Sequence, residues 1–254
     1  MITFLFWNVS RRFPEEVLGA LIAEWNVDVL VLAEVPSSAP DTIQGLPRSG
    51  GRVPTALTIY SRWEMRPIEE TRRWTIRSWE SSEGELLLVA VHLPSPQHFD
   101  EASRTMEAAH FAREIRDVED RRGHRRTILV GDLNMNPFEP GVVGAEGLHA
   151  ISSRAIAAEG SRTIQGREYP FFYNPMWGQL GDRGTYFYRK SVPLCYFWNA
   201  FDQILLRPSL LPFWLVDELR ILTGIGDITF IDSMGRPSAS HFSDHLPILF
   251  RLEL

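Results

Sequence analysis

The stretch "ILVGDLNMNPFEPG", residues 128–141, is the most informative part of the chain. It begins as an apolar strand and then becomes polar, with Asp132, Asn134 and Asn136 at alternate positions. A turn explains one or two such residues, but three of them after a buried strand indicate a site. Because side chains alternate along a strand, we expect Asp132 and Asn134 to face the same way. We expect Asn136, which precedes Pro137, to belong to a turn.

Predicted strands and helices alternate on both sides of this stretch. "ITFLFWNV" at residues 2–9 and "VDVLVLAEV" at 27–35 predict buried strands, and "EEVLGALIAEWN" at 15–26 predicts the helix between them. This order predicts a parallel pair joined by a right-handed crossover. Further strands are predicted at 55–61, 65–79, 84–93, 127–134, 201–206, 227–232 and 246–254. The sequence therefore predicts one α/β domain, residues 1–254, with two packed sheets.

Two more helices are predicted, at 100–119 and at about 147–157. The first would bury Ala102, Met106, Ala109, Ala112, Ile115 and Val118 on one face. Residues 36–54 are rich in Pro, Gly and Ser and predict a loop, and 137–190 predict mostly irregular structure. The segment "RRGHRR", residues 121–126, should form a solvated turn at the end of the 127–134 strand opposite the site.

The composition is that of an ordinary globular protein, and it excludes several classes. A net charge of −6 gives no general attraction to nucleic acid or anionic membranes, although a local basic groove can still form. Cys195 is the only cysteine, which excludes an intrachain disulfide and a zinc site built on several thiolates. The sequence has no signal-peptide pattern and no apolar run of the ~18 residues that a membrane span needs. We expect a cytoplasmic protein without an obligate protein partner.

Polar residues punctuate the predicted strands, and together they indicate a catalytic site. Each one alone is more easily explained as a turn or cap residue. As a set they offer oxygen ligands for a hard cation such as Mg²⁺ and histidines that can contact a phosphate or move a proton. The set is Asn8, Glu34, His92, Asp132, Asn134, Asp202, Asp244 and His245.

The order of these residues resembles the endonuclease/exonuclease/phosphatase superfamily. The matching motifs are "FWNV", "LAEV", "VHLPSP", "GDLNMNP", "FDQILL" and "SDHLPI", which span Asn8 to Ile248. The resemblance implies a deoxyribonuclease I-like, four-layer α/β sandwich, with two mixed sheets face to face and helices outside. It also implies hydrolysis of a phosphate ester with Mg²⁺ or Mn²⁺.

The resemblance implies a metal site at one group of these residues. Glu34 matches the metal-binding glutamate with Asn8 beside it, and Asp244 matches a second acidic metal contact. Three features depart from the family pattern. Ala33 stands where many members have glutamine, and Ser10 stands where abasic-site nucleases often have an acidic residue. Those nucleases also tend to have arginine in the segment before the aspartate that Asp202 matches, where this chain has "WNAF". These departures argue against an abasic endonuclease.

The resemblance implies catalytic roles for the other five residues. Asp132 matches the aspartate that aligns or deprotonates the attacking water, and Asn134 matches an amide that contacts the phosphate. His245 matches the histidine at the scissile phosphate, and Asp202 matches the carboxylate that orients this histidine and should raise its pKa. His92 matches a second histidine that helps bind the phosphate or protonate the leaving group.

Residues 169–201 are dense in aromatic side chains, with Arg183, Arg189 and Lys190 among them. Aromatic rings between basic residues can stack bases and hold a backbone, so the candidate substrate-binding residues are Arg183, Tyr186, Arg189 and Trp198. Packing of these rings, or an apolar lip that touches lipid, are the other interpretations. The favoured function is a nuclease that acts on nucleic acid. The alternatives are an intracellular lipid or small-molecule phosphoesterase and a non-catalytic interaction module.

Overall fold

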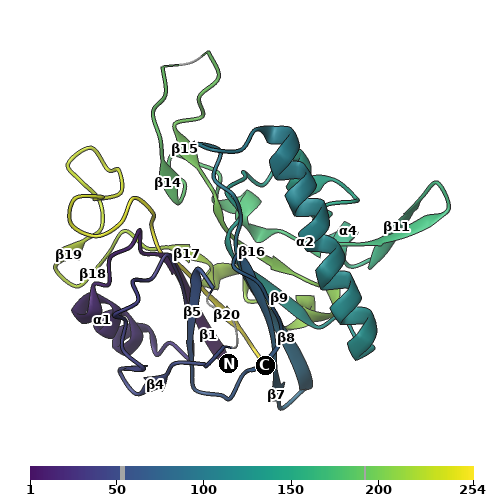
Figure 1. Ribbon diagram of the computed structural model, residues 1–254, viewed down its shortest axis with the longest axis horizontal. Helices are drawn as coiled ribbons and strands as arrows, with labels where there is room; N and C mark the ends of the chain where they lie inside the picture. Colours follow the sequence, from purple (N-terminus) through teal and green to yellow (C-terminus); the bar gives the residue numbers. More distant parts are fainter. Residues whose placement is uncertain (52–54, 192) are drawn as a thin grey trace.

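The computed structural model describes residues 1–51, 55–191 and 193–254, and its main feature is a pair of β-sheets packed face to face (Figure 1). The first sheet has the order β17 (Arg220–Ile221), β20 (Ile248–Leu252), β1 (Ile2–Asn8), β2 (Val29–Ala33), β5 (Leu57–Ser61). The second has the order β10 (Ala150–Ile151), β13 (Phe172–Tyr173), β16 (Asp202–Leu206), β9 (Thr127–Asp132), β8 (Gly84–His92), β7 (Trp74–Ser81), β6 (Arg66–Glu70). Both sheets mix parallel and antiparallel pairs.

One long helix covers the outer face of each sheet. Helix α1 (Glu15–Trp25) packs on the first sheet through Leu18 and Leu21, and α2 (Glu101–Arg122) packs on the second through Phe111 and Ile115. The layers are therefore helix, sheet, sheet, helix, and the predicted four-layer sandwich is confirmed. None of the helices in the described ranges is long and apolar enough to cross a membrane.

Local sequence signals set the ends of both helices. Asn26 takes a left-handed conformation (φ 49°) and its N–H donates to Ile22 O, which ends α1 and returns the chain to β2, parallel to β1. Helix α2 begins at Asp100, whose side chain accepts from the Ser103 N–H, and ends at Gly123 (φ 72°). The "RRGHRR" segment therefore lies before β9, at the end of that strand opposite Asp132.

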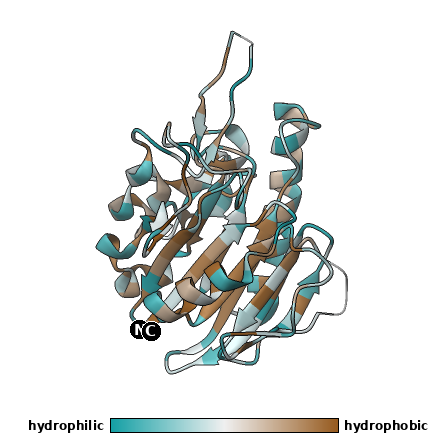
Figure 2. Cartoon of the chain, turned by 90° about the vertical axis from the view of Figure 1, so that its left-hand side faces the viewer, coloured by the Kyte–Doolittle hydropathy of each residue, from teal (hydrophilic) through white to brown (hydrophobic). Residues whose placement is uncertain are grey.

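Alternate residues of the strands fill the space between the sheets, and Figure 2 shows these strands as largely hydrophobic. The inward residues include Phe4 and Phe6 of β1, Leu86, Leu88 and Ala90 of β8, Ile128 and Val130 of β9, and Ile204 and Leu206 of β16. The next position on the same face is polar in each of these four strands. These positions are Asn8, His92, Asp132 and Asp202, so a polar row closes one end of the core between the sheets.

The remaining described elements are short. They are β3 (Thr42–Ile43), β4 (Leu46–Pro47), α3 (Pro140–Val143), α4 (Arg154–Ala157), β11 (Ser161–Ile164), β12 (Arg167–Pro170), η1 (Pro175–Gln179), β14 (Tyr186–Phe187), β15 (Trp198–Asn199), η2 (Pro208–Phe213), η3 (Val216–Glu218), β18 (Gly224–Ile225) and β19 (Ile228–Thr229). The predicted loop at 36–54 thus contains the β3–β4 pair in its described part, and 52–54 lie outside the described residues. Of the strand expected at 227–232 only β19 forms, and the strand expected at 65–79 is two strands, β6 and β7.

Two helix predictions need correction. The helix expected at 147–157 does not form, because His149 has a positive φ (51°), residues 150–151 pair with β13 and only the turn α4 is helical. The predicted buried face of α2 was also wrong in part. Met106 is 73% exposed, and the buried positions include Arg104, Ala108 and Phe111 instead.

Candidate active site

Strand register brings three of the predicted residues into one row. His92 at the end of β8 lies opposite Asp132 at the end of β9, and Asp132 lies opposite Asp202 at the start of β16. Residues directly opposite one another point to the same face of a sheet. All three side chains therefore face the first sheet, where Asn8 ends β1.

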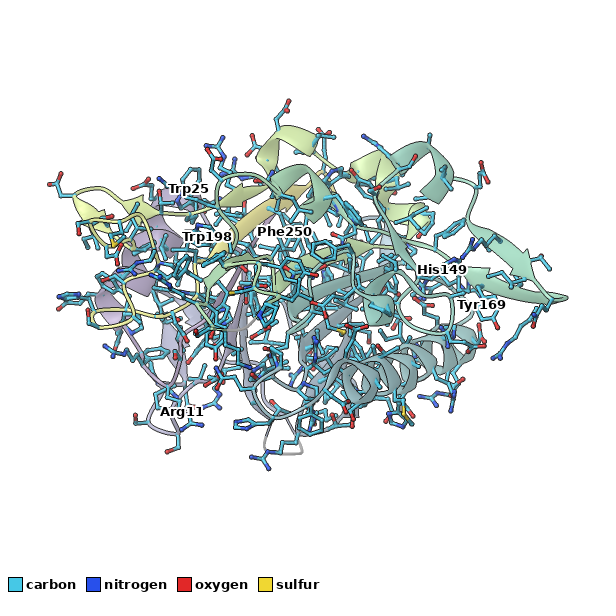
Figure 3. The ribbon with its side chains drawn as sticks, turned by 90° about the horizontal axis from the view of Figure 1, so that it is seen from above. Arg11, Trp25, His149, Tyr169, Trp198 and Phe250 are labelled. Atoms are coloured by element: carbon cyan, nitrogen blue, oxygen red, sulfur yellow. The ribbon has the colours of Figure 1, made fainter. Side chains whose placement is uncertain are left out.

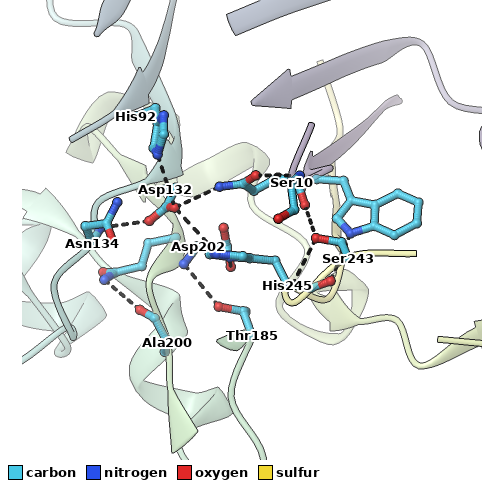
Figure 4. A network of polar contacts seen from close by, with 12 residues as sticks. Ser10, His92, Asp132, Asn134, Thr185, Ala200, Asp202, Ser243 and His245 are labelled. Carbon is cyan, nitrogen blue, oxygen red and sulfur yellow. Dashed lines mark hydrogen bonds and ion pairs between the residues drawn. The ribbon is translucent and has the colours of Figure 1, made fainter. Parts of the chain in front are cut away.

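Asp132 is the centre of this group (Figure 4). Its Oδ2 accepts from Asn8 Nδ2 at 3.1 Å and lies 3.7 Å from His92 Nε2 and 3.8 Å from His245 Nε2. The residue is 1% exposed. Burial raises the pKa of the Asp132 carboxyl, and the nearby His245 partly opposes this effect. A carboxylate with a raised pKa is a better proton acceptor than a solvated one.

Asp202 and His245 form a buried pair behind Asp132. His245 Nδ1 lies 2.8 Å from Asp202 Oδ2, and the two side chains are 7% and 0% exposed. Burial lowers the pKa of His245, but the Asp202 carboxylate outweighs it, and Asp132 and Asp244 add to the rise, so that the pKa reaches about 10. His245 is therefore an imidazolium at neutral pH, and its Nε2–H points to the Asp132 side of the cleft. The expected effect of Asp202 on this pKa is present in the structure.

Neighbouring residues fix the backbone and ring of His245. Trp7 Nε1 donates to His245 O at 3.0 Å. Ser243 Oγ accepts from the His245 N–H at 3.1 Å and donates to Asn8 O at 2.6 Å, which links this loop to β1. The Tyr186 ring packs on the imidazole with 4.6 Å between ring centroids.

The turn after β9 brings Asn134 into the cleft, but not by strand alternation as predicted. The strand ends at Asp132, and Asn134 has a left-handed backbone (φ 50°). Its N–H donates to Asp132 Oδ1 at 2.8 Å, and its Nδ2 donates to Leu93 O at 2.8 Å. Gly131 is required just before, because a Cβ there would lie 2.0 Å from Val91 O of β8. Asn136 is buried and donates to Asn199 Oδ1 at 2.9 Å, so it supports the site from the turn, as expected.

Glu34 and Asn8 are the residues that fit a divalent cation best. Glu34 has a left-handed backbone (φ 54°), a conformation that tends to occur at functional sites. Its Oε1 accepts from Asn8 Nδ2 at 3.3 Å and lies 3.6 Å from His92 Nε2. Oxygen donors of this kind suit Mg²⁺ or Mn²⁺. Asn8 points its Nδ2 to Glu34 and Asp132 and its Oδ1 to the Ser10 N–H at 3.0 Å, so in this structure it orients the two carboxylates beside the metal position. Asp244 lines the same cleft.

Asp132, Asp202 and His245 also lie close enough together to share one ion, with ligand atoms within 4.8 Å of one another. His245 Nδ1 and Asp202 Oδ2 are 2.8 Å apart and hydrogen-bond each other, so an ion held by both atoms would have to replace this hydrogen bond. The arrangement therefore fits a proton-holding triad better than a metal site.

The site opens into a cleft of about 1080 Å³, lined by Glu34, His92, Asp132, Asn134, Asp244 and His245 among others. Of the four predicted substrate-binding residues, only Tyr186 lines this cleft. Arg183 and Arg189 are exposed outside it. Trp198 packs instead on Phe187, with 5.2 Å between ring centroids, and toward the α1 side of the first sheet. In Figure 3, Trp198 lies toward the end of the molecule that carries Arg11 and Trp25.

Sequence reasoning missed several residues of the cleft. Arg104 of α2 is 8% exposed and donates to Asn134 O at 2.7 Å and to Glu139 Oε2 at 2.8 Å. A signal for it existed, because Arg104 continues the helical spacing of the buried Ala108 and Phe111. Arg72 and Arg73, from the turn between β6 and β7, also line the cleft. Nothing in their local sequence marked them as part of a site.

The fold is a DNase I-like α/β sandwich in which Asp132, Asp202 and His245 lie together at one end of the core between the sheets. The pattern of the endonuclease/exonuclease/phosphatase family matches residues 5–245, and the chain belongs to this family. A search among curated protein sequences finds no match.

Solved structures agree with the family in fold. An AP endonuclease from Archaeoglobus fulgidus superposes with a TM-score of 0.60 at 14% identity over 100% of both chains. The 3′ phosphatase NExo from Neisseria, bound to a product DNA hairpin, gives 0.60 at 15% identity over 100% of both chains. D. rerio TDP2, in complex with a single-strand DNA product, gives 0.57 at 18% identity, over 100% of this chain and 99% of that chain. At these identities the likeness concerns the fold.

Proposed function

We propose that this protein is a divalent-metal-dependent phosphodiesterase that cleaves nucleic acid. The observation that carries the proposal is the convergence of Asn8, His92 and His245 on the buried carboxylate of Asp132, with Asp202 behind His245. Hydrolysis of a phosphodiester needs a proton acceptor for water and a donor to the phosphate, and this group supplies both.

The proposed mechanism assigns one role to each side chain. Asp132 orients the attacking water and takes its proton, which its raised pKa favours. His245 donates its Nε2–H to a phosphate oxygen, where negative charge develops. Asp202 fixes the tautomer and orientation of His245. Asn134 is held by Leu93 through one N–H of its amide, and we assign the other N–H to the phosphate.

Glu34 would hold the metal, with Asp244 as a further candidate ligand and Asn8 beside them as the donor that orients Glu34 and Asp132. When bound, a divalent cation neutralises charge on the phosphate and lowers the pKa of a coordinated water. His92 lies 3.6 Å from Glu34 and 3.7 Å from Asp132, between the metal side and the proton-transfer side of the site. We assign His92 to the phosphate or to the leaving group.

Two observations support nucleic acid as the substrate. Aromatic and basic side chains, among them Tyr186, Tyr188 and Lys190, line the cleft together. Two structures of similar fold hold DNA, a single-strand product in one and a hairpin product in the other. Leu194 is 71% exposed on the same side, which keeps an intracellular lipid phosphoesterase as the competing function.

The test is a hydrolysis assay with single- and double-stranded DNA, RNA, a phosphoinositide and sphingomyelin, each with Mg²⁺, Mn²⁺ or a chelator. We expect metal-dependent cleavage of nucleic acid, lowered about 10²- to 10⁴-fold by Asp132→Asn and by His245→Gln. Asp227→Asn, at an exposed turn remote from the cleft, is the control and should retain activity. Cleavage of lipid alone would refute the nuclease, and full activity of both variants would refute the site.

A further inference from the structure

The wall of the cleft beside His245 carries a line of aromatic rings that leads away from the catalytic centre. The Tyr186 ring lies 4.6 Å from the His245 ring, and the Tyr188 ring lies 6.3 Å further on, inclined by 18° to that of Tyr186. Lys190 Nζ lies 5.9 Å from the Tyr188 ring centroid. These three residues occupy alternate positions of an extended segment, and all three line the cleft.

The backbone around this line is paired, which fixes where the rings lie. Residues Tyr186–Phe187 pair with Trp198–Asn199 as β14 and β15, and the Tyr188 N–H donates to Phe197 O at 2.8 Å. Phe187, between the two tyrosines, faces away from the cleft and packs on Trp198. Tyr186 and Tyr188 are both half-buried. The rings are therefore held in place before any ligand binds.

Basic residues from another element also line the cleft. Arg72 and Arg73 lie between β6 and β7, and backbone hydrogen bonds hold them, because Arg72 O accepts from Ala56 N at 2.9 Å and Arg73 O accepts from His92 N at 2.8 Å. The Arg73 guanidinium lies over the Phe99 ring, 5.2 Å from its centroid. Arg11 also lines the cleft, near Glu34. The cleft thus combines rings suited to base faces with cations suited to phosphates.

We propose that this part of the cleft is a subsite for single-stranded nucleic acid, in which the base next to the scissile phosphate stacks on Tyr188 and its phosphate meets Lys190. The inference rests on the proposed function and names its substrate class. A ring on the cleft wall can stack only on a base whose face is free, and neighbouring pairs cover these faces in a duplex. Duplex binding also depends on phosphate contacts spread along both strands, and a chain of net charge −6 gives a duplex no general attraction beyond the cleft.

The experiment measures binding rather than turnover, with the full chain in the presence of a chelator. The probes are a 12-nucleotide single strand that carries 2-aminopurine, whose fluorescence falls on stacking, and the duplex of the same sequence. We expect the single strand to bind more tightly than the duplex. Tyr188→Leu should weaken single-strand binding roughly 5- to 100-fold and abolish the fluorescence change, with little effect on the duplex.

Three further variants separate stacking from structure. Tyr188→Phe keeps the ring, so this variant should bind the single strand as tightly as the unmodified chain. Phe187→Leu changes the neighbouring ring outside the cleft, so its affinity for the single strand should also be unchanged. Lys190→Ala should reduce the slope of log K against log salt by about 0.7, as expected for one phosphate contact on a single strand. This variant also serves if Tyr188→Leu does not fold.

Several outcomes would overturn the subsite. They are equal affinity for strand and duplex, an unchanged fluorescence response in Tyr188→Leu, or binding of phosphatidylserine vesicles through this wall without binding of the single strand. Failure of the proposed function is a separate result, because it appears as absence of hydrolysis with any metal while strand binding is still measured.

Discussion

Among the described residues, Asp202 has no hydrogen-bond partner at its Oδ1, and its Oδ2 accepts from His245 Nδ1, so its charge acts mainly on this ring. The carboxylate is 0% exposed, and a charge so placed is costly unless it is paired. The protonated imidazole is its partner. The pair therefore keeps a proton donor in the site throughout the neutral pH range.

Asp202→Asn tests this role at the scale of one residue. In the proposed mechanism the protonated His245 is the active form, and its pKa is about 10, so activity of the unmodified chain should fall as pH rises through about 10. In the variant, Asp202 no longer outweighs the burial that lowers the pKa of His245. The loss of activity with rising pH should therefore begin at lower pH, and kcat at pH 7 should drop roughly 10³-fold. The measurement is kcat against pH. An exposed-site control, Asp217→Asn, should keep the original profile.

Single residues at strand ends could be predicted because alternate residues of a strand point to the same face. A polar residue two positions beyond the last buried apolar one therefore also points inward. Asn8, His92, Asp132 and Asp202 follow this rule. Asn134 does not, since its position depends on a left-handed turn held by Asp132 and Leu93. Arg183, Arg189 and Trp198 lie outside the cleft. Their position depends on how the separate β14–β15 sheet is placed beside the two main sheets, which no local sequence pattern encodes.

Helix α2 connects the outer layer to the site through Arg104. Its guanidinium reaches from the buried face of the helix to Asn134 O and Glu139, and so supports the strained turn that carries Asn134. Sequence periodicity predicted the helix, but the assignment of Met106 to its buried face left Arg104 on the polar side. An arginine can lie on the buried face of a helix only when other parts of the chain accept its hydrogen bonds. The two acceptors of Arg104 are 30 and 35 residues away in the sequence.

Arg104→Met tests this connection at the scale of the element. Methionine retains much of the buried volume but leaves Asn134 O without its donor, so we expect kcat to fall about 10- to 100-fold. We expect the KM of a minimal phosphodiester to change little, because Arg104 is 8% exposed and its guanidinium bonds to Asn134 O and Glu139. Arg113→Met, at an exposed position of the same helix, is the matched control. Equal kcat in the two variants would show that Arg104 does not position Asn134.

At the scale of the whole molecule, the site belongs to neither sheet alone. Asn8 and His245 come from the first sheet and its loops, and His92, Asp132 and Asp202 come from the second. The resemblance to a known family predicted the sandwich because its motifs mark strand ends over nearly the whole chain. The spacing between the sheets could not be read from those motifs, since it depends on how side chains such as Phe4 and Phe250 fill the core.

Phe250→Leu tests whether packing between the sheets sets the geometry of catalysis. The Phe250 ring stacks on Phe4 with 4.8 Å between ring centroids, in the layer that separates the two halves of the site. The substitution should cost about 1 kcal/mol and lower Tm by about 2–4 °C. Because the 3.1 Å contact of Asn8 with Asp132 crosses from one sheet to the other, we also expect kcat to fall several-fold at temperatures well below Tm.

Phe111→Leu is the matched control. It removes an equally buried ring on the inner face of α2, outside the core between the sheets. It should lower Tm by a similar amount and leave kcat unchanged, and a parallel loss of kcat in both variants would contradict a specific role for the core between the sheets.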